Sequence, residues 1–235
     1  MRHQVLILPG YGNSGPGHWQ TLWQDEHKDW RRVNQRDWLR PVLSHWLETL
    51  NQAVENARHP VVLVAHSLAG PLVAHFALTP LSYKIAAALL VAPADVELSN
   101  DVRFNTRGFT PVPLAPLPFK TVVVASRNDP YLDLDRARTF ARGWRASLVT
   151  MGACGHINAE SGHGSWPEGQ VLLKELMAAA KYDRTAPFYD PLPAQARPGD
   201  ALSISPRSGC RFAAGNAKKS TKREHVPIQF NQDVL

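Results

Sequence analysis

The chain has 235 residues, which is enough for one sizeable hydrophobic core and a further extension. No apolar run reaches the length of a transmembrane helix, and the first one, residues 5–8, is too short for a signal-peptide core. Most of the formal net charge of +6 comes from residues 181–235, so residues 1–180 carry no basic footprint that would indicate nucleic acid or an anionic membrane.

Apolar runs alternate with amphipathic segments along residues 1–180. In chain order, the predicted elements are a strand at 4–8, a helix at 18–30, a short strand at 33–38, a helix at 41–57, a strand at 61–66, a helix at 68–78, strands at 85–92 and 121–125, a helix at 133–144, a strand at 147–151 and a helix at 166–180. This alternation predicts an α/β fold, with a mostly parallel sheet and helices on both faces. Ligands of such a sheet bind at the carboxyl ends of its strands.

A glycine-rich loop, residues 9–17, follows the first strand. Its glycines permit a tight turn that exposes backbone N–H groups. The loop has neither the Gly-Lys-Ser/Thr ending of a phosphate-binding loop nor the glycine spacing of a dinucleotide-binding loop. We expect it to offer an N–H near Tyr11 to an oxyanion, and the alternative is a plain connection between strand and helix.

Ser67 stands where the third predicted strand meets a helix-compatible run. This order is the context of a nucleophile elbow, whose usual sequence pattern is G-x-S-x-G. Ala65 and Ala69 occupy the two glycine positions here, which is a mild departure because the turn needs small residues. The simpler interpretation is that Ser67 only caps the helix.

A nucleophilic serine needs a general base, and that base needs an orienting acid. Asp129 follows the fifth predicted strand, and His156 lies in a glycine-rich loop after the sixth. Taken singly, Asp129 fits a turn before proline and His156 fits a surface loop. Their joint occurrence, in the order Ser, Asp, His, favours a catalytic triad with Ser67. Asp95, after the fourth strand, is the alternative acid.

The proline-rich segment 95–119 predicts a small lid over the site. Within it Phe104 and Phe109 are expected to face the substrate, and Asp95 and His163 are further candidates for the pocket. We interpret His66, directly before the nucleophile, as structural. The histidines lack zinc-ligand spacing, so no metal site is predicted.

The two cysteines are too few for a disulfide framework, so a cytoplasmic protein with free thiols is expected. Cys154 is interpreted as a packed thiol. We interpret residues 1–180 as one domain and residues 181–235 as a proline-rich basic extension that is disordered or loosely docked. A solvated extension is favoured over nucleic-acid contact, and a protein partner of the extension is left open.

Four segments resemble a known family of small serine hydrolases, related to retinoblastoma-binding protein 9 and the bacterial YdeN-type proteins. These segments are AHSLA at 65–69, ASRNDPY at 125–131, GHINA at 155–159 and, after Gly162, WPEG at 166–169. The resemblance covers residues 3 to about 180. It implies a compact, capless α/β-hydrolase fold in a cytoplasmic protein, with Ser67, Asp129 and His156 as the triad.

The predicted function is hydrolysis of carboxylic esters with small to medium acyl groups, through an acyl-enzyme. The backbone N–H groups of Leu68 and of a residue near Tyr11 would bind the oxyanion. This chemistry requires no metal and no organic cofactor, only a small-molecule acyl substrate. The alternative is a binding module on the same fold with vestigial catalysis, which the alanines of the elbow suggest.

Overall fold

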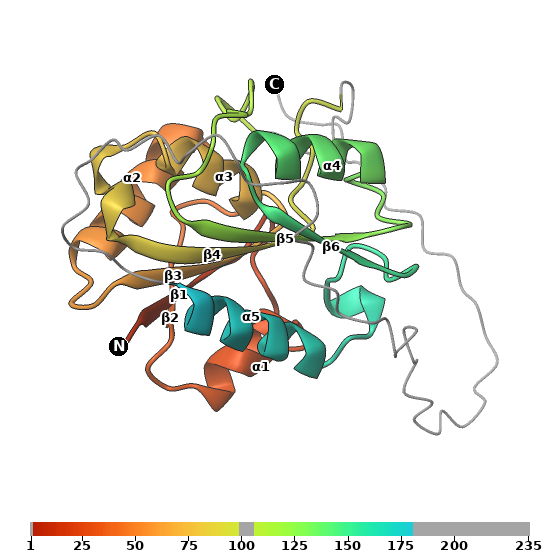
Figure 1. Ribbon diagram of the computed structural model, residues 1–235, viewed down its shortest axis with the longest axis horizontal. Coiled ribbons are helices and arrows are strands. Elements are labelled where there is room, and N and C mark those ends of the chain that lie inside the picture. Colours follow the sequence, from red (N-terminus) through yellow and green to blue (C-terminus); the bar gives the residue numbers. More distant parts are fainter. Residues whose placement is uncertain (1, 99–105, 181–235) are drawn as a thin grey trace, which may run out of the picture.

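The computed structural model describes residues 2–98 and 106–180, which form a central sheet between two layers of helices (Figure 1). The strands are β1 (Gln4–Leu8), β2 (Arg31–Arg32), β3 (Val61–His66), β4 (Ile85–Val91), β5 (Lys120–Ser126) and β6 (Ser147–Met151). Their order in the sheet is β2-β1-β3-β4-β5-β6, and all five pairings are parallel. The prediction of an α/β fold with a mostly parallel sheet is confirmed, and the described sheet is parallel throughout.

Helices cover both faces of this sheet, as predicted. The helices are α1 (Trp19–Glu26), α2 (Leu43–Glu55), α3 (Ala69–Phe76), α4 (Leu134–Gly143) and α5 (Pro167–Ala179), with short 3-10 helices η1 (Pro80–Lys84) and η2 (Ala159–Ser161). In Figure 1, α2, α3 and α4 lie on one face, and α1 and α5 lie on the other. The loops at the carboxyl ends of the strands therefore emerge between two helical layers.

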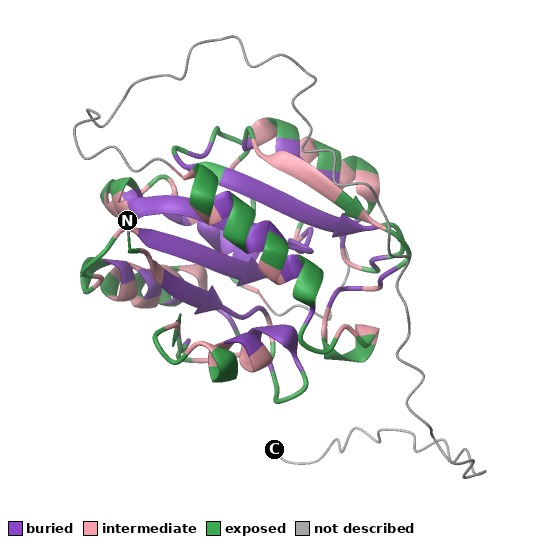
Figure 2. Cartoon of the chain, turned by 60° about the horizontal axis from the view of Figure 1, so that its bottom comes forward, coloured by how far each residue is buried: buried purple, intermediate pink, exposed green. Residues whose placement is uncertain are grey.

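The central strands are apolar without interruption because both of their faces are covered. Every residue of β3 and β4 is buried. Side chains of β3 alternate between two cores: Leu63 packs with Trp46 on the side of α2 and α3, and Val64 packs with Trp19 on the side of α1 and α5. Figure 2 shows this as buried central strands beneath helices whose outward faces are exposed.

The second strand differs most from the prediction. It comprises Arg31–Arg32 instead of residues 33–38, and α1 ends at Glu26 instead of residue 30. The two arginines pair with Leu6 and Ile7 at the edge of the sheet. A short, charged edge strand discourages pairing with another chain, but it carries none of the apolar alternation by which strands are predicted.

No helix in residues 2–98 and 106–180 is both long and apolar enough to cross a membrane. The expectations for Phe104 and for the extension 181–235 lie outside the described residues. The division of the chain at residue 180 therefore stays a prediction.

Candidate active site

Ser67 lies on a strained turn between β3 and α3. Its φ is +56°, in the left-handed region, where a residue other than glycine costs on the order of 1–3 kcal/mol. The backbone on both sides holds it there: its N–H donates to the Val91 carbonyl at 3.0 Å, and its carbonyl accepts from the N–H groups of Gly70 at 2.9 Å and Ala94 at 3.1 Å. This geometry is that of a nucleophile elbow.

Glycine is needed close to the elbow, although not at the positions of the usual motif. Ala65 and Ala69 fit there as fully buried residues. A Cβ on Gly10 would lie 2.7 Å from the Ser67 Cβ, and a Cβ on Gly70 would lie 2.4 Å from the Pro93 Cβ. The close approach of the backbones therefore depends on Gly10, in the loop after β1, and on Gly70, in α3.

The structure brings Ser67, His156 and Asp129 together in one hydrogen-bonded chain. The Nε2 atom of His156 lies 2.9 Å from Ser67 Oγ, and its Nδ1 lies 2.9 Å from both carboxylate oxygens of Asp129. A carboxylate only accepts, so Nδ1 carries the proton of the neutral imidazole and Nε2 accepts from the serine hydroxyl. The Asp129 side chain is fully buried, and the ring of Tyr131 meets that of His156 edge-on at 4.6 Å.

The loops that carry Asp129 and His156 are joined to each other. Asn128 Oδ1 accepts from the Gly155 N–H at 2.7 Å and from the Ser126 hydroxyl at 2.9 Å. Ser126 Oγ accepts in turn from the Cys154 N–H at 2.9 Å. These bonds fix the residues next to Asp129 against those next to His156.

Asp95, the alternative acid, has a different partner. Its carboxylate lies 3.0 Å from Nε of Arg136, at the start of α4, in an ion pair whose alignment is not that of a hydrogen bond. Arg136 also pairs with Glu97. The Asp95 N–H donates to the Tyr131 carbonyl at 2.9 Å. The imidazole of His156 is therefore oriented by Asp129, and Asp95 ties the end of β4 to α4.

Two pocket candidates remain, Phe109 and His163, and the first of them lies in the core. Phe109 is 1% exposed and packs edge-on against Trp46 at 5.8 Å, so the expectation that it faces the substrate is wrong. The reason is that its large ring completes the core beside α2. Nε2 of His163 lies 3.2 Å from the Cys154 carbonyl, within the loop that follows β6, and its role at the pocket stays a prediction.

The two expected oxyanion donors belong to the elbow and to the loop that packs against it. Leu68 directly follows Ser67 in a right-handed helical conformation, and a Cβ on Gly10 would lie 3.1 Å from its backbone nitrogen. Tyr11, next to Gly10, is partly buried and packs on the core. The loop after β1 therefore lies against the first turn of α3, while the roles of Leu68 and Tyr11 stay predictions.

Sequence reasoning missed the side chains that anchor this glycine-rich loop. Arg32 donates hydrogen bonds to Asn13, Ser14, Thr21 and Gln24. The fully buried Gln20 donates from Nε2 to the carbonyls of Leu8 and Val64 and accepts from the Ser14 hydroxyl at 2.7 Å. No sequence pattern marks these anchors, because α1 has polar residues at most of its positions and Arg32 lies in a charged edge strand.

His66 was expected to be structural, and in the structure it contacts the main chain of His156. It is buried, and its Nε2 lies 2.9 Å from the main-chain carbonyl of His156. Its ring lies 4.8 Å from the ring of His156 and 4.7 Å from that of His18. Burial holds the pKa of His66 well below its usual range and lowers the pKa of His18 to about 3, so both imidazoles are neutral.

Cys154 is buried as expected but is disulfide-bonded, so the prediction of a packed free thiol is wrong. The cytoplasmic location loses the support that free thiols would give it. Within the described ranges, no three His, Cys, Asp or Glu side chains form a group that could hold a metal ion.

Comparisons with known proteins agree with this architecture. A family model described as serine hydrolase matches residues 5–175. The chain is 31% identical to a YdeN-like hydrolase from Pectobacterium atrosepticum, with a TM-score of 0.66 and coverage of 75% of this chain and 91% of that one. The chain is 21% identical to the ydeN gene product of B. subtilis, with a TM-score of 0.62 and coverage of 75% of this chain and 100% of that one. The esterase RhEst1 from Rhodococcus sp. ECU1013 shares the fold: it is 13% identical, with a TM-score of 0.59 and coverage of 76% of this chain and 91% of that one. No curated protein sequence gives a match.

Proposed function

The chain belongs to the serine hydrolase family, and we propose that it hydrolyses carboxylic esters with small to medium acyl groups through Ser67, His156 and Asp129. The observation that supports this proposal most is the unbroken series of 2.9 Å contacts from the serine hydroxyl to the buried carboxylate. The strained φ of Ser67 adds support, because such strain is found where a side chain must be presented for chemistry.

In the proposed reaction, Ser67 Oγ attacks the acyl carbon while His156 Nε2 accepts the hydroxyl proton. Asp129 holds the Nδ1–H and stabilises the imidazolium that forms. The imidazolium gives the proton to the leaving alcohol as the ester C–O bond breaks, which leaves an acyl-serine. Water then attacks this acyl group with His156 as the base, and the acid is released as Ser67 regains its proton.

The oxyanion of each tetrahedral intermediate would be bound by the backbone N–H groups of Leu68 and of a residue near Tyr11. The N–H of Leu68 is suited to this role because the helix α3 begins there, and helix N-termini favour negative charge. The choice of esters as substrates rests on fold-level analogy with the Rhodococcus esterase. It is therefore the part of the proposal that needs a direct assay.

A fluorophosphonate probe tests the nucleophile. We expect the native protein to be labelled and to hydrolyse p-nitrophenyl acetate or butyrate, and Ser67→Ala to do neither, because no other oxygen lies in its place. The exposed Ser44 offers a control: Ser44→Ala should label like the native chain. Equal labelling of Ser67→Ala and the native chain would remove Ser67 as nucleophile, and no labelling of either would favour the binding module.

Gly10→Ala should impair catalysis through the elbow. The added methyl would lie 2.7 Å from the Ser67 Cβ and 2.8 Å from the His66 carbonyl oxygen, so the serine must shift. We expect kcat to fall on the order of 100-fold and the free energy of unfolding to fall by about 1–3 kcal/mol. Steady-state kinetics and urea unfolding measure the two effects.

Gly15→Ala is the matched control for this substitution. It lies in the same loop, and a Cβ there would meet no atom within 4 Å. Its kcat should stay at the native value. If Gly10→Ala also kept the native kcat, the close approach of this loop to the elbow would not matter for the reaction.

A further inference from the structure

The loop that carries His156 contains a second strained residue. Ile157, directly after the proposed base, has a φ of +50° and is fully buried. A β-branched residue adopts this left-handed conformation rarely, because its side chain crowds the backbone. Such a conformation persists only where the surrounding structure holds it, so contacts on each side of Ile157 must stabilise it.

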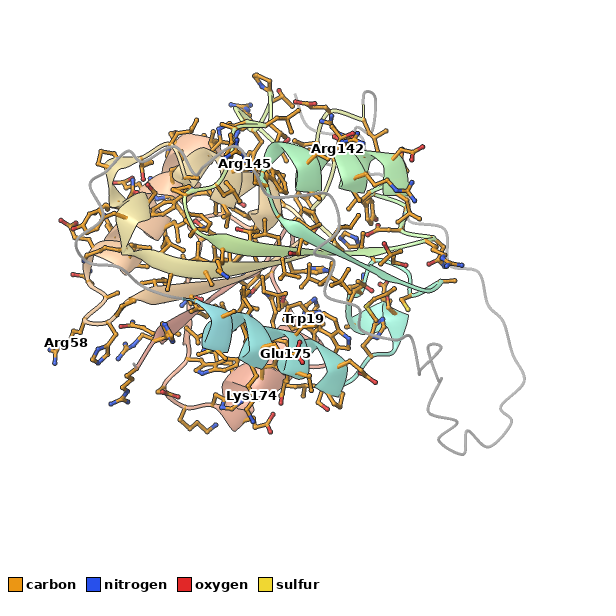
Figure 3. All side chains as sticks on the ribbon, viewed as in Figure 1. Trp19, Arg58, Arg142, Arg145, Lys174 and Glu175 are labelled. Atoms are coloured by element: carbon orange, nitrogen blue, oxygen red, sulfur yellow. The ribbon has the colours of Figure 1, made fainter. Side chains whose placement is uncertain are left out.

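Two buried side-chain donors hold consecutive carbonyls at this point. The Nε2 atom of His66 lies 2.9 Å from the carbonyl oxygen of His156, and Nε1 of Trp19 donates to the carbonyl of Ile157 at 2.8 Å. His66 ends β3 and Trp19 begins α1, so the donors come from two elements far from the loop in sequence. Figure 3 marks Trp19 between the sheet and the layer of α1 and α5.

His66 must donate in its contact, because a carbonyl oxygen only accepts. Its Nε2 therefore carries the proton of a neutral ring, which agrees with the lowered pKa of this buried histidine. The rings of His18 and Trp19 pack against it at 4.7 Å and 6.0 Å, which fixes its orientation. A neutral donor also places no positive charge beside the ring of His156 when that ring becomes an imidazolium.

His66 also immediately precedes Ser67 in the chain. Its bond to the His156 carbonyl therefore ties the main chain of the base directly to the strand end that presents the nucleophile. The bond between His156 Nε2 and Ser67 Oγ closes this ring of contacts from the other side. A change in the first bond would alter the distance across the second.

We propose that His66 and Trp19 are positioning residues for the reaction, because they hold the carbonyls of His156 and Ile157 and so keep the imidazole in line with Ser67. Neither touches the reacting atoms. This role rests on the proposed function, since it assumes that His156 is the base.

The test compares variants that remove one donor each. Trp19→Phe removes the indole N–H and retains an aromatic ring, and His66→Leu removes the imidazole donor. We expect each to lower kcat for p-nitrophenyl butyrate on the order of 10- to 100-fold, with KM within about threefold of the native value. His66→Gln, whose amide N–H can reach the same carbonyl, should recover most of the loss.

Trp23→Phe is the control for general loss of packing. Trp23 is as buried as Trp19, lies in the same helix and also donates to a carbonyl, that of Ser165 at 2.6 Å, but not to the residues around His156. Trp23→Phe should lower the thermal unfolding temperature as Trp19→Phe does, but should keep the native kcat. If His66→Leu does not fold, the comparison of kcat between Trp19→Phe and Trp23→Phe alone tests the positioning role.

Equal kcat for Trp19→Phe and Trp23→Phe would overturn the positioning role, and so would a His66→Gln enzyme as slow as a folded His66→Leu enzyme. Fluorophosphonate labelling separates this failure from failure of the proposed function. If labelling depends on Ser67 but the donor variants keep the native kcat, only the positioning role is wrong. If the native chain shows no labelling that depends on Ser67, the proposed function fails first.

Discussion

Asp129→Asn should lower kcat by about four orders of magnitude, as the equivalent change does in serine proteases. Asparagine has the size of aspartate, but its amide group can donate to Nδ1 of His156. The imidazole would then carry its proton on Nε2, where it could no longer accept the proton of Ser67. KM should change little, because the buried carboxylate, 0% exposed in the native chain, cannot contact the substrate.

Asp95→Asn is the matched control for this substitution. Asp95 also follows a strand at the carboxyl edge of the sheet, but it pairs with Arg136 instead of the imidazole. We expect its kcat to stay within about tenfold of the native value, because it touches no reacting group. Steady-state kinetics on p-nitrophenyl butyrate measures both variants. If Asp95→Asn were the crippled enzyme and Asp129→Asn the active one, the acid would have been assigned to the wrong strand.

Mild acid should destabilise the fold through its buried neutral histidines. The pKa of His18 is lowered from 6.5 to about 3, first by burial and then by the charge of Arg32. Between these two values the unfolded chain binds a proton that the folded chain does not, so the free energy of unfolding falls as the pH falls. At pH 5 this histidine alone accounts for a loss of about 2 kcal/mol. His66, whose pKa is also lowered by burial, adds a loss of the same sign.

Urea unfolding at pH 7.5 and pH 5 measures this loss. His18→Asn should remove the part that belongs to residue 18, because asparagine does not titrate and can still cap α1 as His18 does through Nδ1. The exposed His59 provides the control, and His59→Asn should keep the native difference between the two pH values. A native chain equally stable at both pH values would contradict the prediction.

Most of the fold could be predicted from the sequence because helices cover both faces of the sheet, and strands buried in this way are apolar along their length. The strands 4–8 and 61–66 were predicted at their observed bounds, since apolar runs mark buried parallel strands. The edge strand Arg31–Arg32 was missed because pairing with β1 holds it in place, and its own side chains show no pattern. The resemblance to YdeN-type serine hydrolases is confirmed by the family match and the shared architecture.

The candidate site was predictable where it follows strand ends. Ser67, Asp129 and His156 were each expected from their places after β3, β5 and β6, and the structure brings them together. Their catalytic roles stay predictions until the labelling experiment is done. The hydrogen bonds of His66 and Trp19 could not be predicted, because each joins residues 90 or 138 positions apart and depends on how the helices pack.

The all-parallel order of the sheet has a consequence for how the chain folds. Each pairing joins two strands that are separated in sequence by a crossover, so few contacts of the sheet form locally, and such topologies fold slowly. Ser67 and His156 lie 89 residues apart and meet only when β3, β4, β5 and β6 have all aligned. A partly folded chain can thus have native helices and an inert serine. The proposed reactivity of Ser67 is thus a property of the completed sheet, and its recovery would mark the end of folding.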